Sequence, residues 1–332
     1  MSSPNNNMQQ QQLILLFLFL FLSRTQSFRF VQFNAEWLFY NYYAPAQCPG
    51  SGCTWPNQSA ALTHIQTISS VLSELQPDII NICEVEGLDE LNMLKYPNST
   101  AYLLPGTDTA TGQNVGLISR IPINTPLKRT SATRQYPIPG STCGYTGNPG
   151  TTGVSKHYYI TLSLPNGLDI GLIGVHLLAY PTDPTRCAER EAQALIVQEL
   201  VGNFTAEGLP VIVMGDFNDY DSETLDALSD KPLSSVLDIV KDHPSPVGRA
   251  FVKGTNTLIN AASFMPQTDR WSDWWDKNGD CVGTQNEMTM IDHVLVSPEI
   301  YDRITNVEIW HEYAEYCGKW NSDHYPVIVD IV

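Results

Sequence analysis

Apolar runs of strand length recur along the chain, and an amphipathic helix separates the first two of them. Residues 28–34 alternate between apolar and polar positions, as a half-buried strand does. Apolar residues then fall at helical spacing from 61 to 75, and a continuous apolar run follows at 78–84. Strand, helix and strand in this order form a βα unit that is layered on a sheet. The sequence therefore predicts an α/β fold.

The rest of the chain adds antiparallel pairing. We expect a strand at 113–119 and a hairpin of residues 157–164 and 168–175, turned by Pro165-Asn166-Gly167. A second helix is predicted over 186–201, and further strands are predicted over 209–215, 290–297 and 325–332. Between 229 and 286 the pattern is weak, and we expect long loops there.

The N-terminal segment predicts secretion. Residues 13–22 form an unbroken apolar run, and small residues stand at the −3 and −1 positions of a cleavage after Ser27. The run is shorter than the roughly 20 residues of a membrane-spanning helix. We predict a signal peptide over 1–27, with an uncleaved anchor as the alternative, and one domain over 28–332. The mature protein is expected outside the cell or in the lumen of the secretory or endolysosomal pathway, as a monomer without an obligate protein partner.

The net charge bears on the partner. Without residues 1–27 the formal charge is 17 − 35 = −18, because only Arg24 is lost from the 18 Lys and Arg. Such a charge repels polyanions over long range. A divalent cation and a local basic rim can reverse the field at a site, so catalysis on a polyanion is not excluded. The candidates for a rim, with scattered solvated charges as the alternative, are Lys128, Arg129, Arg134, Arg249, Lys253 and Arg270.

Seven cysteines in a secreted chain suggest disulfides and one leftover thiol. Cys83 lies inside an apolar run, where a small buried thiol packs well. Cys48 and Cys53 can close a local ring. The pairing of the other four is left open, and these are Cys143, Cys187, Cys281 and Cys317. Three glycosylation sequons, at Asn57, Asn98 and Asn203, fit the same secretory route.

Polar and ionisable residues recur where the apolar strands begin or end. They are Asn34, Glu36, Glu84, His176, Asp216, Asn218 and the pair Asp323-His324. Strand ends that emerge on one sheet edge converge, and the loops there are the usual place for active sites. Each residue alone is weak evidence, because a turn or a capped core residue gives the same local pattern.

The ordered set of motifs resembles a known superfamily. The motifs are Phe33-Asn34, Ile82-Cys-Glu84, Gly116-Leu-Ile-Ser-Arg120, Val175-His176-Leu177, Met214-Gly-Asp-Phe-Asn218, Met290-Ile-Asp-His293 and Asn321-Ser-Asp-His-Tyr-Pro326. In this order they resemble the endonuclease/exonuclease/phosphatase superfamily, which has the deoxyribonuclease-I-like fold. The resemblance covers essentially the whole mature chain. It implies a four-layered α/β sandwich of two packed mixed β-sheets flanked by helices.

The resemblance also implies a metal-dependent phosphodiesterase. Glu84 would be the principal ligand of Mg²⁺, or of Mn²⁺ or Ca²⁺, with Asn34 and Asp323 completing the metal environment. Carboxylate oxygens are the donors that Mg²⁺ prefers. Asp216 would orient or deprotonate the attacking water, and the neutral amide of Asn218 would face a phosphate oxygen.

Two histidines have implied roles of their own. His324 would contact the scissile phosphate or take a proton, with Asp292 fixing its tautomer and raising its pKa. His176 would donate to the phosphate or act as the acid at the leaving group. His293 should turn to the opposite strand face and pack in the core. Substrate contacts are expected from Asn114 and Arg270.

Loop sequences favour a nucleic acid, DNA or RNA, as the substrate. No segment matches inositol 5-phosphatases, and a signal peptide with a charge of −18 argues against abasic-site repair enzymes. One alternative is a sphingomyelinase-like phospholipase that reaches a membrane phospholipid with Trp271, Trp274 and Trp275, although Asp273 and Asp276 interleave them. Buried tryptophans that clamp a loop over the sheet are the plainer interpretation. Another alternative is a catalytically silent binding module, but no polar residue of the set is missing.

Overall fold

The computed structural model describes residues 27–41, 55–123, 125–242, 258–276, 279–312 and 322–332. Several predictions fall outside these residues: nearly all of the signal peptide, the pair Cys48 and Cys53, Cys317, and the rim cations Arg249 and Lys253. No helix within the described ranges is both long and apolar enough to cross a membrane.

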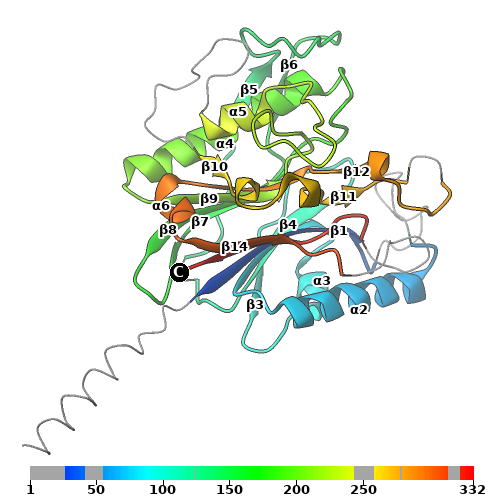
Figure 1. Cartoon of the computed structure of the whole chain (residues 1–332), viewed down its shortest axis with the longest axis vertical. Helices are drawn as coiled ribbons and strands as arrows, with labels where there is room; N and C mark the ends of the chain where they lie inside the picture. Colours follow the sequence, from blue (N-terminus) through cyan, green and yellow to red (C-terminus); the bar gives the residue numbers. More distant parts are fainter. Residues whose placement is uncertain (1–26, 42–54, 124, 243–257, 277–278, 313–321) are drawn as a thin grey trace, which may run out of the picture.

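Two main mixed β-sheets pack against each other (Figure 1). The first contains β1 (Phe28–Leu38), β2 (Ile79–Val85), β3 (Thr100–Leu103), β4 (Asn114–Ser119), β14 (Ile304–Ile309) and β15 (Val327–Ile331), in the order β14-β15-β1-β2-β4-β3. The second contains β7 (Lys156–Ser163), β8 (Asp169–His176), β9 (Val211–Asp216), β10 (Ile259–Asn260) and β13 (Asp292–Val296), in the order β10-β13-β9-β8-β7. Each sheet has one parallel pair, β1 with β2 and β8 with β9.

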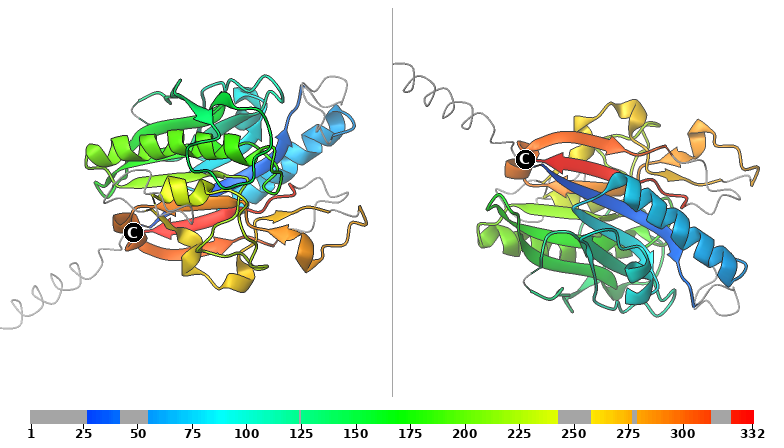
Figure 2. Two further views of the ribbon diagram at one scale, coloured as in Figure 1. Left: turned by 90° about the horizontal axis from the view of Figure 1, so that it is seen from above. Right: turned by 90° about the horizontal axis from the view of Figure 1, so that it is seen from below.

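Helices cover the outer faces of both sheets. Figure 2 shows α4 (Cys187–Ala206) and α5 (Val236–Lys241) over the second sheet from above, and α2 (Gln58–Leu75) across the first sheet from below. The short helices are α3 (Leu88–Met93) and α6 (Pro298–Tyr301). Two small ribbons pair β5 (Thr133–Tyr136) with β6 (Gly150–Gly153), and β11 (Asp273–Trp274) with β12 (Met288–Thr289). The predicted helix–sheet–sheet–helix layering is confirmed.

The sequence pattern explains where the core lies. Asn57 accepts a hydrogen bond from the backbone N of Ala60 and so caps α2, as short polar side chains do at helix starts. The apolar stripe of α2, including Ile65 and Leu72, packs on the outer face of β1 and β2. Inward-facing residues such as Phe30 form a second core between the sheets. Strand alternation thus divides each sheet between two cores.

Between residues 229 and 286 the prediction of long loops is partly wrong. The segment contains α5, β10, β11 and the 3₁₀ turns Ala261–Phe264, Gln267–Asp269 and Gln285–Glu287. Elements of two to six residues are too short to show a period, and the two strands among them are held by long-range pairing with β13 and β12. In the same segment Trp274 is fully buried, whereas Trp275 is 57 % exposed. The clamp interpretation therefore fits Trp274 and not Trp275.

The described residues include one disulfide and one free thiol, and the sequence predicts cysteines of both kinds. Cys143 and Cys187 form a disulfide that ties the loop before β6 to the start of α4. Cys83 is a buried free thiol, as its apolar surroundings predict. A disulfide of this kind is typical of an oxidising compartment.

Candidate active site

The polar strand ends of both sheets meet at one edge. Within the second sheet, His176 at the end of β8 pairs in register with Asp216 at the end of β9. β13 runs antiparallel to β9, so its first residue, Asp292, also lies opposite Asp216. From the first sheet, the Nδ2 of Asn34 donates to Asp216 Oδ2 at 3.0 Å and to Glu84 Oε1 at 3.3 Å. This amide therefore joins the two sheets at the site.

Asp216 and Asn218 stand at a sharp turn that follows β9. The backbone N of Asn218 donates to Asp216 Oδ1 at 2.8 Å, and Asn218 itself has a positive φ of 50°. Its Nδ2 donates to the carbonyl of Leu177 at 3.3 Å. Burial and the neighbouring Asp292 raise the pKa of Asp216 to about 7. Both oxygens of Asp216 are thus held by donors while its charge is disfavoured.

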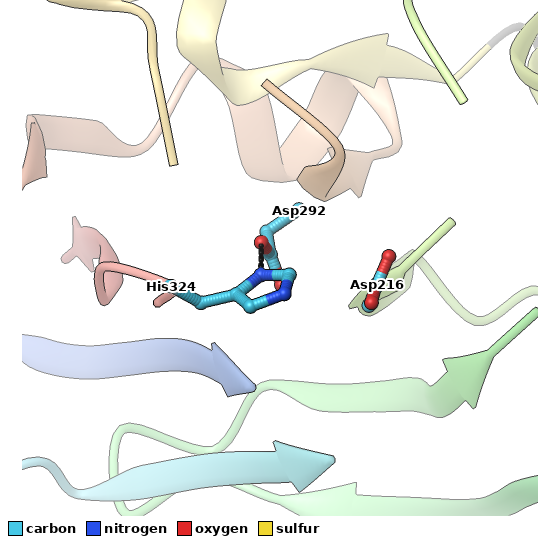
Figure 3. Close-up of side chains that lie close together, drawn as sticks. All are labelled: Asp216, Asp292 and His324. Atoms are coloured by element: carbon cyan, nitrogen blue, oxygen red, sulfur yellow. Dashed lines mark hydrogen bonds and ion pairs between the residues drawn. The ribbon is translucent and has the colours of Figure 1, made fainter. Parts of the chain in front are cut away.

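His324 is surrounded by carboxylates. Its Nδ1 is 2.6 Å from Asp292 Oδ2, and the ring lies beside Asp216 (Figure 3). Its Nε2 is 3.6 Å from Asp273 Oδ1 and 3.8 Å from Asp323 Oδ1. Burial alone would lower the pKa of His324, but these carboxylates outweigh it and raise the pKa well above 6.5. The imidazole is therefore a cation at neutral pH.

The β11–β12 ribbon, which the sequence did not predict, holds His324 in position. The backbone N of Trp274 in β11 donates to the carbonyl of Asp323 at 2.9 Å. Ser272, immediately before β11, donates through Oγ to Asp292 Oδ2 at 3.0 Å. Asp273 thereby becomes a site residue, although the sequence argument treated it only as a charge between tryptophans. A strand of two residues leaves no pattern in the sequence, because the contact depends on backbone pairing between Asp273 and His324, 51 positions apart.

His176 has the opposite surroundings. Its Nε2 is 3.6 Å from Asp216 Oδ2, 4.0 Å from Glu84 Oε1 and 3.5 Å from Lys156 Nζ. Burial lowers its pKa well below 6.5, and Lys156 and His324 lower it further. The ring is therefore neutral, and its buried Nδ1 has no hydrogen-bond partner.

Lys156 is a site residue that sequence reasoning missed. It is 8 % exposed, and its Nζ is 3.2 Å from Gln113 Oε1 and 3.7 Å from Asp108 Oδ2. It pairs in register with His176 across the β7–β8 hairpin. Pairing the residues of the predicted hairpin outward from the Pro165-Asn166-Gly167 turn would have placed Lys156 opposite His176. The site consequently has a fixed cation at the His176 end.

The carboxylates of this buried Asp and His cluster can bind a divalent metal, with the protonated His324 beside them. Ligand atoms of Asp216, Asp292 and His324 lie within 4.8 Å of one another, and so do those of Asp273, Asp323 and His324. Asp323 Oδ1 is a buried atom with no hydrogen-bond partner. Burial, together with Asp273 and Glu84, raises the pKa of Asp323 to about 7. Crowded, partly unpartnered oxygen donors of this kind fit a hard cation such as Mg²⁺.

Glu84 lies beside these two groups of ligand atoms. Its Oε1 accepts from Asn34, and its Oε2 accepts from the backbone N of Trp37 at 3.0 Å. Glu36 accepts from the backbone N of Asp323 at 3.2 Å and so links β1 to the Asp323-His324 turn. The metal-ligand roles of Asn34, Glu84 and Asp323 are proposals that this adjacency supports.

The two residues expected to contact substrate instead hold loops in this structure. Asn114 accepts from the backbone N of Gly106 at 2.6 Å and donates to the carbonyl of Glu86 at 2.9 Å. Arg270 donates to the carbonyls of Met265 and Leu225 at 2.8 and 3.1 Å. Neither residue has a hydrogen bond to the Asp and His cluster described above. Their roles in substrate binding stay predictions.

The predicted rim arginines within the described residues are also engaged locally. Arg129 donates to the carbonyls of Pro105 and Ser155, and Arg134 pairs with Glu199. Lys128 is exposed and bridges to Tyr159 through its backbone.

Comparison with known proteins identifies the family. A sequence profile of the Endonuclease/Exonuclease/phosphatase family matches residues 31–324. The fold is similar to that of an endonuclease/exonuclease/phosphatase family protein from Bacteroides thetaiotaomicron, at 16 % identity and a TM-score of 0.53, covering 92 % of this chain and 97 % of that one. A search of curated protein sequences returned no match.

Two further structures carry a stated activity. A mannosyl-6-phosphatase from Bacteroides thetaiotaomicron shares 16 % identity with a TM-score of 0.53, covering 92 % of this chain and 99 % of that one. A 3′ phosphatase from Neisseria, solved with a product DNA hairpin, shares 14 % identity with a TM-score of 0.55 at the same coverages. At these identities the likeness shows the fold alone. The profile match, which spans nearly the whole chain, shows that the protein belongs to the endonuclease/exonuclease/phosphatase family.

Proposed function

We propose that this protein is a secreted, divalent-metal-dependent phosphodiesterase that hydrolyses nucleic acid. One observation carries the proposal: side chains from both sheets form two groups of contacts at one edge, and these adjoin to make one network because the ligand atoms of Asp216, Asp292 and His324 lie within 4.8 Å of one another. The network consists of Asn34, Glu84, His176, Asp216, Asn218, Asp292, Asp323 and His324. A silent binding module has no need to keep this complete set in contact.

The residues match the needs of phosphodiester hydrolysis. That reaction requires an oriented water, stabilised charge on the phosphoryl oxygens and a proton for the leaving oxygen. Asp216, held by Asn34 and Asn218, orients the water. A cation held by Glu84, Asn34 and Asp323 would stabilise charge on the phosphoryl oxygens.

The two histidines take different parts in the same reaction. His324 is protonated, so its Nε2 offers a charged donor to a phosphate oxygen or a proton to the leaving oxygen. His176 is neutral and offers a hydrogen bond without charge, while Lys156 beside it supplies the charge. The substrate phosphate would thereby have a cationic group on either side, His324 at one end of the site and Lys156 at the other.

Secretion rests on three features. They are the apolar run before Ser27, the Cys143–Cys187 disulfide and the exposure of the three sequon asparagines, Asn57, Asn98 and Asn203. Exposed sequons are accessible for glycosylation in the secretory pathway.

A phospholipid is the second candidate substrate, because Trp275 is 57 % exposed close to Asp273 and His324. Aromatic side chains of this kind favour a membrane interface. Against it, Trp274 is buried, and Trp271 stacks on His311 with ring centroids 3.6 Å apart. Of the three tryptophans, only Trp275 is therefore available to contact a membrane. Nucleic acid remains the preferred substrate.

A substrate panel tests the proposal. Purified mature protein is incubated with plasmid DNA, single-stranded DNA, RNA and sphingomyelin vesicles, with Mg²⁺, Mn²⁺, Ca²⁺ or a chelator. Glu84→Ala and His324→Ala are run alongside, with Asp330→Asn as a carboxylate control outside the site. We expect metal-dependent cleavage of nucleic acid that both site variants abolish. Turnover of lipid alone would replace the nuclease proposal, and activity that survives the chelator and both variants would refute the site.

A further inference from the structure

The loop that follows His176 is held by a buried arginine. Arg190 of α4 is fully buried, and its guanidinium donates to four consecutive carbonyls at 3.0 to 3.4 Å. These belong to Leu178, Ala179, Tyr180 and Pro181. Its Nε also pairs with Asp219 Oδ2 at 3.3 Å. Burying a guanidinium is costly unless it is paired and hydrogen-bonded, so these contacts confine the loop to one conformation.

The same loop is attached directly to the active site. The backbone N of Leu177 donates to the carbonyl of Asp216 at 2.9 Å, and the carbonyl of Leu177 accepts from Asn218. The backbone N of Leu178 donates to Gln193 Oε1 at 3.0 Å. The loop position is therefore fixed relative to the residues that handle the phosphate.

This rigid loop presents an exposed aromatic ring. Tyr180 is 59 % exposed and has a φ of 71°, a left-handed backbone conformation that is uncommon for a bulky residue. Backbone strain of this kind persists where the surrounding structure enforces it, and it is concentrated at functional sites. Core packing does not account for Tyr180, because most of its side chain is in solvent.

A guanidinium accompanies the ring. The Cζ of Arg186 lies 5.2 Å from the ring centroid of Tyr180, a cation–π contact. Within the described ranges, no carboxylate forms an ion pair with Arg186, unlike the rim residue Arg134. Tyr180 is four residues beyond His176, which places it within about 14 Å of the site along the chain. An exposed aromatic ring combined with an arginine is the usual platform for a nucleobase and its phosphate.

We propose that Tyr180 and Arg186 form a platform that stacks a nucleobase flanking the scissile phosphate, with Arg186 contacting the adjoining backbone phosphate. This inference rests on the proposed nuclease function and names the part of the substrate that the loop reads. Stacking requires a base but no particular one, so the platform selects nucleic acid over base-free phosphodiesters without sequence preference.

The test compares substrates with and without bases. The rate constant kcat/KM is measured for an oligothymidylate and for an oligomer of equal length in which tetrahydrofuran units replace the nucleosides. Wild type should prefer the oligothymidylate about tenfold or more. Tyr180→Ala should abolish the preference, Tyr180→Phe should keep it, and Phe264→Ala, at another exposed aromatic, should leave it unchanged. Binding of both oligomers by the Glu84→Gln and Glu84→Gln/Tyr180→Ala proteins gives a readout without turnover.

The outcomes separate this inference from the function on which it rests. If wild type cleaves both oligomers equally, or if Tyr180→Ala lowers both rates by the same factor, the platform is refuted while the nuclease stands. If wild type cleaves no nucleic acid but hydrolyses sphingomyelin, both are refuted. Arg186→Gln should reduce the salt dependence of binding to both oligomers, because a phosphate contact is lost. Circular dichroism melting confirms that each variant is folded.

Discussion

The His324 end and the His176 end of the site contain the same side chain in opposite surroundings. At the first, Asp292, Asp273 and Asp323 approach the imidazole and raise its pKa. At the second, burial and Lys156 lower the pKa of the imidazole. The two histidines are therefore not interchangeable as donors. One end provides a cationic ring, and the other provides a neutral ring beside a cationic lysine.

The largest expected effect comes from removing the carboxylate that orients His324. Asp292→Asn should lower kcat by about a thousandfold, because an amide at this position favours the wrong tautomer and no longer stabilises the cation. Steady-state kinetics on DNA measures it, with Asp330→Asn as the matched control. A loss of less than about tenfold would show that the two ends do not differ as described.

The second-largest loss of activity is expected from removing Lys156, the cation beside His176. Lys156→Met should lower kcat/KM by about a hundredfold, since a preorganised donor to the phosphate is lost. Lys128→Met removes an exposed lysine near the same hairpin and should leave the rate unchanged. Equal effects of the two substitutions would mean that Lys156 acts only through net charge.

A smaller effect is expected from Asp273, which raises the pKa of His324. Asp273→Asn should move the alkaline limb of the pH–rate profile to lower pH and reduce the rate at pH 8 about threefold. The limb should not move in Thr289→Val, which removes only the hydroxyl that donates to Asp273. A shift of the limb to higher pH would contradict the electrostatic picture.

The smallest effect is on stability without metal. The pKa of Asp216 in the folded protein is about 7, above its value of 3.8 in an unfolded chain. The folded state therefore binds the proton more tightly, and the stability that this proton confers is lost as pH rises from about 4 to 7. In a chelator, Asp216→Asn should melt a few degrees above wild type at pH 8 and show no such advantage at pH 4. Calorimetry that finds the advantage at pH 4 instead would reverse the sign.

Much of the fold and site could be predicted because strands and amphipathic helices have periods that survive in the sequence. Asn34, Glu84, His176 and Asp216 stand at the ends of such strands, and the structure brings them into contact. His293 follows from the same alternation: it is fully buried and faces Asn260, away from the Asp and His cluster.

The rest depends on contacts that no local pattern encodes. Asp273 reaches His324 through a strand of two residues. Lys156 matters only through its register with His176, and Arg190 only through its carbonyl partners and Asp219. The positions of basic residues in the sequence do not show which of them can contact substrate. Arg129, for example, donates to backbone carbonyls instead.

The central claim is that this strand-end cluster holds a divalent cation, and a titration of metal-free protein with Mn²⁺, following the free ion by electron paramagnetic resonance, tests it most directly. The account predicts saturable binding by wild type that Glu84→Gln weakens by at least about tenfold. Equal Mn²⁺ binding by wild type and Glu84→Gln, or none by either, would contradict it.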